Sequence, residues 1–127
     1  TADRISDVSA AIEEVADEAR LHPIDGYVGH GIGTQMHQAP DVPNYRTRGR
    51  SPRVRPGMCL ALEPMLVIGT DESAILNDEW TVVSVDGSRA AHWEHSVAVH
   101  EDGIWVLTAA DGGAARLAEH GVVPVAP

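Results

Sequence analysis

The chain has 127 residues, a formal net charge of -10 at neutral pH and a hydrophobic content of 43%. This length suits one domain, and the acidic balance argues against a specific nucleic-acid binder or a protein of anionic membrane surfaces. No stretch of the sequence approaches the roughly 20 apolar residues of a membrane span. Cys59 is the lone cysteine, which excludes an internal disulfide, fits a reducing compartment and predicts a cytoplasmic location.

Residues 3–20 predict one long amphipathic helix. Its apolar residues follow the three-and-four spacing that makes one stripe, and they are Ile5, Val8, Ile12, Val15 and Ala19. Pro23 discourages continuation of the helix beyond His22. Because such a helix is marginal alone, the stripe needs a partner surface.

Residues 24–58 predict loops. The first part, residues 24–38, has no helical period, and its glycines at 29, 31 and 33 permit either positive φ or close backbone approach. The second part, residues 39–58, carries four prolines and reads as a surface loop.

Strands are predicted for most of the remaining chain. Residues 59–68 read as a strand that is broken or ended near Pro64, and further strands are expected at 80–85, 90–99 and 104–108. Asp-Gly turns between them favour an antiparallel meander. The whole order predicts an α+β fold, one long helix packed on an antiparallel sheet, followed by a C-terminal tail over residues 109–127.

Two strand carboxylates are the first candidates for chemistry. Glu63 lies in an otherwise apolar segment, where a carboxylate must be paired, hydrogen-bonded or metal-bound unless the strand is an edge and the side chain faces water. Alternation along residues 90–99 puts His92 and Glu94 on one face among small residues. A second carboxylate beside Glu63 is what a metal bridge would use, whereas the alternative is a solvent-facing glutamate on a two-sided sheet.

Two histidines are the second candidates. His30 lies between glycines, so an ion or a substrate can approach it, although a lone histidine in such a loop is usually structural or solvated. His37 follows seven residues later, too far for the helical pair of an H-E-x-x-H motif. Two histidines and two glutamates are together the ingredients of a metal-activated water.

These segments, in this order, resemble the type I methionine aminopeptidase family. The resembling segments are Tyr27–Gly33, Met36–Pro40, Asn44-Tyr45, Pro56–Met58, Leu62–Met65, Trp80-Thr81, Asp86–Ser88 and Trp93–His95. The resemblance implies a pita-bread fold built from two pseudo-symmetric halves. Residues 1–108 resemble its C-terminal half, with residues 109–127 as a tail.

The resemblance also implies a reaction and its residues. The family removes the N-terminal (initiator) methionine from peptides and nascent proteins, by attack of a metal-bound hydroxide on the first peptide bond. It uses two divalent metal ions, for which Mn, Fe, Co and Zn all suit the ligands. It implies His30, Glu63 and Glu94 as metal ligands, with Glu94 bridging. Glu63 would also act as acid and base, and His37 would contact the scissile peptide. Met36 and Trp80 match positions that line the methionine pocket.

The ligand set within the chain is incomplete. The family draws two aspartate ligands from its N-terminal half, and no segment of this sequence resembles them. We therefore expect the N-terminal half of the same enzyme to complete the site, supplied by a partner chain, by a cleaved parent chain or by residues outside this sequence. The alternative is a catalytically inactive pita-bread remnant that acts as an interaction or binding module.

Overall fold

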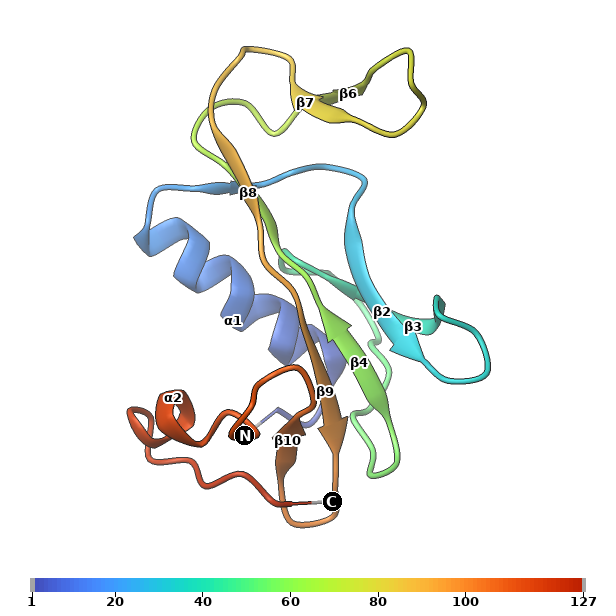
Figure 1. The fold of residues 1–127 in the computed structure, drawn as a ribbon, viewed down its shortest axis with the longest axis vertical. Coiled ribbons are helices and arrows are strands. Elements are labelled where there is room, and N and C mark those ends of the chain that lie inside the picture. The colour runs from blue at the N-terminus through green and yellow to red at the C-terminus, as the bar shows by residue number, and fades with distance from the viewer. Residues whose placement is uncertain (1, 127) are drawn as a thin grey trace.

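The computed structural model describes residues 2–126. Its elements, in chain order, are α1 (Ile5–Glu18), β1 (His22–Pro23), β2 (Val28–Ile32), β3 (Gln38–Pro43), β4 (Cys59–Leu62), β5 (Met65–Val67), β6 (Ser73–Ile75), β7 (Val82–Ser84), β8 (Ala90–His92), β9 (His95–Val99), β10 (Ile104–Val106) and α2 (Ala114–Ala118). Figure 1 shows α1 beside the long strands, with the β6–β7 hairpin projecting at one end. The predicted α+β class is confirmed.

The long strands pass through two antiparallel sheets. One sheet has the order β10-β9-β4-β2-β3 and the other the order β1-β5-β8. Because β5 follows β4 and β8 precedes β9, the same two lines of chain run side by side through both sheets (Figure 1). Each line is interrupted once, at residues 63–64 and at residues 93–94.

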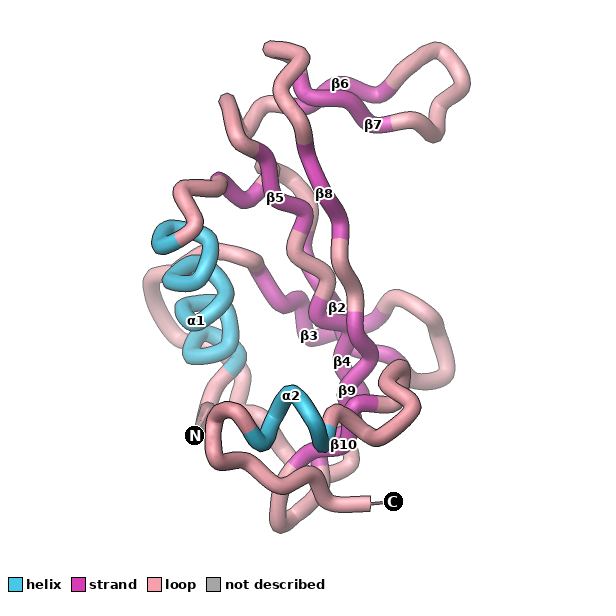
Figure 2. Tube along the Cα trace, turned by 60° about the vertical axis from the view of Figure 1, so that its left-hand side comes forward, coloured by secondary structure: helices cyan, strands magenta, loops and turns pink. Residues whose placement is uncertain are grey.

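The core lies between α1 and the larger sheet. Ile5, Val42 and Leu60 are its buried centre, and half-buried apolar side chains surround them. In Figure 2, α1 covers one side of these strands, whereas α2 lies beside β10.

The predicted apolar stripe of the helix is correct in its first half, where Ile5 is buried and Val8 packs against the core, and wrong at its end. Ile5, Ser9 and Ala16 are its buried residues. They are spaced by four and seven, so they share one line along the helix. Val15 lies roughly a quarter-turn away from this line and is exposed, and Ala19 is the exposed C-cap. The prediction was wrong for these two residues because the buried position in the second half of the helix is taken by the small Ala16.

The predicted glycine loop is a strand. β2 contains Gly29, His30 and Gly31, and it pairs with both β3 and β4. A Cβ on Gly29 would lie 2.3 Å from the carbonyl oxygen of Ala61, and one on Gly31 would lie 2.5 Å from that of Ala39. Close backbone approach, not positive φ, therefore explains these glycines. The loop predicted over residues 39–58 also begins too early, because β3 continues to Pro43 at the sheet edge, where proline is tolerated.

The meander is correct only at its end. β9 and β10 pair as predicted, but β7 pairs with β6, β4 with β9, and β5 with β8. The segment between β5 and β8 is thus an excursion with its own hairpin, which we call the β6–β7 arm (residues 68–89). Backbone N–H groups of Gly69 and Thr70 close its base by donating to Ser88 Oγ at 3.2 Å and to Asp86 Oδ2 at 3.0 Å.

The C-terminal segment returns to the sheet. The N–H of Val125 donates to the carbonyl of Ile104 at 2.9 Å, and Gly112 and Gly113 lie against Trp105 and Val106. The division at residue 108 stays a prediction. Neither described helix is long and apolar enough to cross a bilayer.

Candidate metal centre

The strand register places the two candidate carboxylates opposite each other. Leu62 pairs with His95 on one side of the interruption, and Met65 pairs with His92 on the other. The same register continues through the gap, so Glu63 faces Glu94 and Pro64 faces Trp93. The N–H of Trp93 donates to the carbonyl of Pro64 at 3.2 Å, which holds the two lines together there. Opposed like charges destabilise a sheet, so this position favours a cation between them.

The same register brings two imidazoles to Glu63. His30 pairs with Ala61, two residues before Glu63, and its Nε2 lies 3.1 Å from Glu63 Oε1. His92 lies two residues before Glu94 on the other line, and its Nε2 is 3.5 Å from Glu63 Oε2. Each oxygen of the Glu63 carboxylate therefore has its own imidazole.

The ring orientation of His30 suits a metal ligand. Its Nδ1 lies 3.0 Å from the carbonyl oxygen of Gly31. A carbonyl only accepts, so Nδ1 carries the hydrogen and Nε2 is left to face Glu63. This is the arrangement in which a backbone carbonyl fixes the tautomer of a ligating histidine. Gly29 beside it lets β2 lie close to Ala61 of β4, and Gly31 lets β2 lie close to Ala39 of β3.

The donor set fits a divalent ion. Donor atoms of Glu63, His92 and Glu94 all lie within 4.8 Å of one another. Carboxylate and imidazole together suit Mn, Fe, Co and Zn. Of the predicted ligands, Glu63 and Glu94 belong to this group. The third predicted ligand, His30, contacts Glu63.

The predicted substrate residues lie at different distances from this centre. The ring centroid of His37 lies 4.3 Å from that of His30, and the two ring planes are tilted by 56°. Met36 precedes it and is 73% exposed. Trp80 belongs to the β6–β7 arm and is 87% exposed. Its backbone N–H donates to Asp78 Oδ1. His95, which was part of the resembling motif, is turned to Thr108, with Nδ1 2.7 Å from Oγ1.

His92 is the residue that the sequence interpretation left out of the ligand set. The signal was present, because strand alternation places His92 and Glu94 on one face. What the sequence alone does not show is the pairing of His92 with Met65, which brings the His92 side chain to Glu63.

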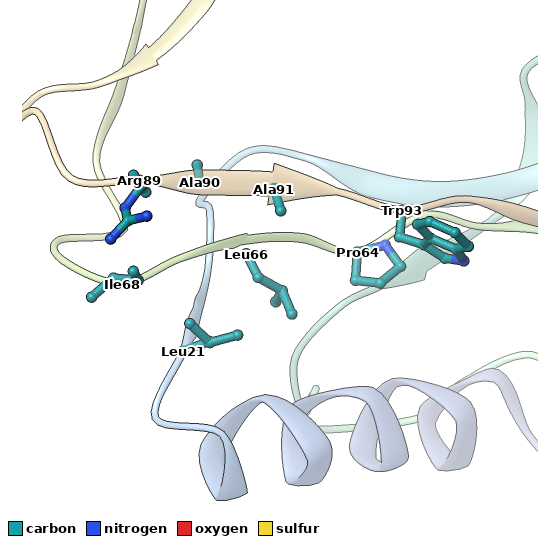
Figure 3. Close-up of a pocket in the computed structure, with 8 residues that line it drawn as sticks. All are labelled: Leu21, Pro64, Leu66, Ile68, Arg89, Ala90, Ala91 and Trp93. Carbon is teal, nitrogen blue, oxygen red and sulfur yellow. The ribbon is translucent and has the colours of Figure 1, made fainter.

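An apolar groove of about 440 Å³ lies beside the centre, between α1 and the β5–β8 pair (Figure 3). Its lining residues are Leu21, Pro64, Leu66, Ile68, Arg89, Ala90, Ala91 and Trp93. Pro64 directly follows Glu63, and Trp93 directly precedes Glu94. Because side chains alternate along a strand, Pro64 and Trp93 point away from the two carboxylates. We call this surface the α1–β5 groove.

Comparison with known proteins identifies the family. The sequence profile of metallopeptidase family M24 matches residues 2–101. The chain belongs to metallopeptidase family M24. Among curated M24 relatives, methionine aminopeptidase 1 of Mycobacterium tuberculosis is 50% identical over 111 residues, covering 83% of this chain and 42% of that protein. Methionine aminopeptidase 1 of Bacillus subtilis is 42% identical over 106 residues, covering 84% of this chain and 43% of that protein.

Solved M24 structures confirm the fold. The methionine aminopeptidase of Thermotoga maritima superposes with a TM-score of 0.79 at 43% identity, over 84% of this chain and 43% of that one. That of Rickettsia prowazekii has a TM-score of 0.78 at 31% identity, over 85% of this chain and 44% of that one. The resemblance to methionine aminopeptidases and the half pita-bread fold are thus confirmed. The chain spans about two fifths of the length of these M24 relatives.

Proposed function

We propose that this chain is the metal-binding half of a methionine aminopeptidase, which removes initiator methionine from peptides and nascent proteins. The observation that carries the proposal is the pair of carboxylates, Glu63 and Glu94, opposed across two strands with His30 on one of them. Membership of M24 supports it, and so do the names of the relatives.

We propose His30, Glu63 and Glu94 as ligands of two divalent ions, with Glu94 shared. The ions, when bound, supply an activated water and polarise the carbonyl of the first peptide bond. The chemistry of the donors leaves Mn, Fe, Co and Zn as candidates.

The other roles fall to side chains of this chain. Glu63 accepts the proton of the attacking water and passes it to the leaving amine, as a positioned carboxylate does. His37, whose ring lies against that of His30, contacts the scissile peptide. Met36 and Trp80 line the methionine pocket. Both side chains are exposed and therefore free to contact a substrate, and their surfaces suit the thioether of methionine.

A polypeptide corresponding to the N-terminal part of the relatives completes the site in this proposal. It contributes the two aspartate ligands and covers the α1–β5 groove. The length comparison supports it, because more than half of each relative has no counterpart in this chain. Since nascent chains are made in the cytoplasm, we propose a cytoplasmic location.

The test is methionine release from a Met-Ala-Ser peptide with Mn²⁺ or Co²⁺. We expect the purified chain alone to be inactive, and the chain expressed together with the N-terminal part of the Mycobacterium tuberculosis relative to be active. Glu94→Gln in this complex should lower the rate at least about 100-fold, on the scale of losing a positioned catalytic carboxylate. Glu101→Gln, an exposed glutamate away from the centre, is the control. Near-normal activity of Glu94→Gln would contradict the proposal.

The interaction module is the second candidate. The α1–β5 groove favours it, because apolar grooves mark binding sites for other chains. If the complex forms and binds metal but releases no methionine, the module is the better description of the chain.

A further inference from the structure

His92 contacts the carboxylate that the proposed site uses, on the oxygen that His30 leaves free. Its Nε2 lies 3.5 Å from Glu63 Oε2, whereas His30 lies 3.1 Å from Oε1. His92 is 41% exposed at its side chain, so it is neither buried in the core nor fixed by packing. Its position is set by the register of β8 with β5, in which it pairs with Met65.

The spacing of the donors suits a single ion on this side of Glu63. Zinc-like ions hold nitrogen and oxygen ligands at about 2.0–2.2 Å, so neighbouring donors around one ion are roughly 3–4 Å apart. The nitrogen of His92 and the oxygens of Glu63 and Glu94 lie within 4.8 Å of one another. Small side-chain rotations close this difference, because His92 and Glu94 are both exposed.

We propose that His92 is a further metal ligand of this protein and, with Glu63 and Glu94, holds one divalent ion of the kind that imidazole favours, Zn²⁺ or Co²⁺. The inference rests on the metal centre of the proposed function, but His92 is outside its ligand set. His30 and His92 then serve opposite oxygens of Glu63, so the carboxylate faces two ion positions.

One consequence concerns the chain by itself. The three ligands come from two adjacent strand lines that this chain supplies whole, without a residue from the missing part of the relatives. The isolated chain should therefore bind one ion before any partner completes the centre. Without His92, the two carboxylates alone would offer only oxygen donors at this position, which imidazole-preferring ions bind less well.

The test is a Co²⁺ titration of the isolated chain. Calorimetry measures the affinity and the number of ions bound, visible absorption reports the bound Co²⁺, and paramagnetically shifted N–H resonances report the imidazoles that bind it. We compare the wild-type chain with His92→Gln, Glu94→Gln and, as a matched control, His120→Gln, an exposed histidine far along the chain. We expect one ion per chain in the wild type. His92→Gln should weaken Co²⁺ binding by at least about 10–100-fold, the loss typical when a residue that hydrogen-bonds to a metal ligand is removed. It should also remove one shifted resonance. His120→Gln should change neither the affinity nor the resonances.

The outcomes separate this inference from the proposed function. If His92→Gln leaves affinity and resonances unchanged while Glu94→Gln weakens binding, the role of His92 is overturned and the metal centre stands. If neither variant alters binding, or if the wild-type chain binds no Co²⁺, this inference is overturned, and methionine release by the completed enzyme decides the proposed function separately. Circular dichroism confirms that the variants fold, as expected for substitutions at exposed positions.

Discussion

Glu63 and Glu94 show how a single register decides the chemistry of a residue. Each carboxylate alone is compatible with a solvent-facing strand position. Placed opposite each other, they repel at close range, and the Nε2 of His30, an acceptor in the tautomer that the Gly31 carbonyl fixes, faces Glu63 without a charge that would offset this repulsion. A divalent cation removes the repulsion and satisfies the donors together, which is why we assign this position to a metal.

Gly29 is the residue whose substitution should report most directly on this packing. A Cβ there would meet the backbone oxygen of Ala61 at 2.3 Å, and backbone cannot move aside cheaply. We expect Gly29→Ala to destabilise the protein by about 1–3 kcal/mol, the range typical of overpacking. Urea unfolding followed by circular dichroism measures it.

Gly33→Ala is the matched control. Its Cβ would meet only the end of the Gln38 side chain, which can rotate away, so it should cost much less than Gly29→Ala. Equal losses of stability in the two variants would show that close approach of β2 to β4 is not the reason for the glycine.

At the level of elements, the β6–β7 arm depends on one carboxylate. The N–H of Thr70 donates to Asp86 and, with the hydroxyl and N–H of Ser88, lowers the pKa of this carboxyl to about 2. Because the pKa in the folded protein is lower than in an unfolded chain, the ionised form stabilises the arm. That contribution is complete above about pH 4 and is lost as the pH falls towards 2.

We therefore expect the arm to loosen in acid before the large sheet does. The measurement is the amide resonance and hydrogen exchange of Thr70 between pH 5 and 2, with the amide of Leu60 in β4 as an internal reference. Asp86→Asn should abolish the transition, since an amide does not titrate in this range. A Thr70 amide that reports a midpoint near the ordinary 3.8 would contradict the assignment.

The interruptions of the two strand lines, at residues 63–64 and 93–94, make room for the site. A proline cannot donate to the ladder, so Pro64 breaks the strand line immediately after Glu63. The line continues in register as β5. The site thus occupies a gap between two sheets, where side chains have room beside the backbone.

At the scale of the whole molecule, the α1–β5 groove is the surface that the proposed N-terminal partner should cover. Ile68 lines it and is 56% exposed. We expect Ile68→Glu to leave the isolated chain folded but to prevent complex formation with the N-terminal part of the Mycobacterium tuberculosis relative, because it would place a charge that must lose its water in an otherwise apolar interface. Size-exclusion chromatography of the co-expressed proteins measures the effect.

Val85→Glu is the control for this experiment. Val85 has a similar exposure of 51% but is not among the residues that line the groove. Complex formation by Ile68→Glu at wild-type level would show that the partner binds elsewhere.

The sequence by itself determined the class of the fold, the helix and the segments that carry chemistry, because these depend on local spacing. Gly-His-Gly, Leu-Glu-Pro and Trp-Glu-His are short and unusual enough to indicate the family. It also indicated that Glu63 needs a partner unless its side chain faces water at a sheet edge, since a buried carboxylate must be compensated.

Only the tertiary structure decided which residues meet. Strand pairing joins positions about 30 residues apart, and nothing local specifies that β5 pairs with β8 rather than with the hairpin between them. That choice brings Glu94 opposite Glu63 and adds His92 to the centre. Pairing with β3 and β4, likewise distant in sequence, makes residues 28–32 a strand. Local pattern fixes which face a side chain takes, but long-range register, set by packing over the whole sheet, fixes its neighbours.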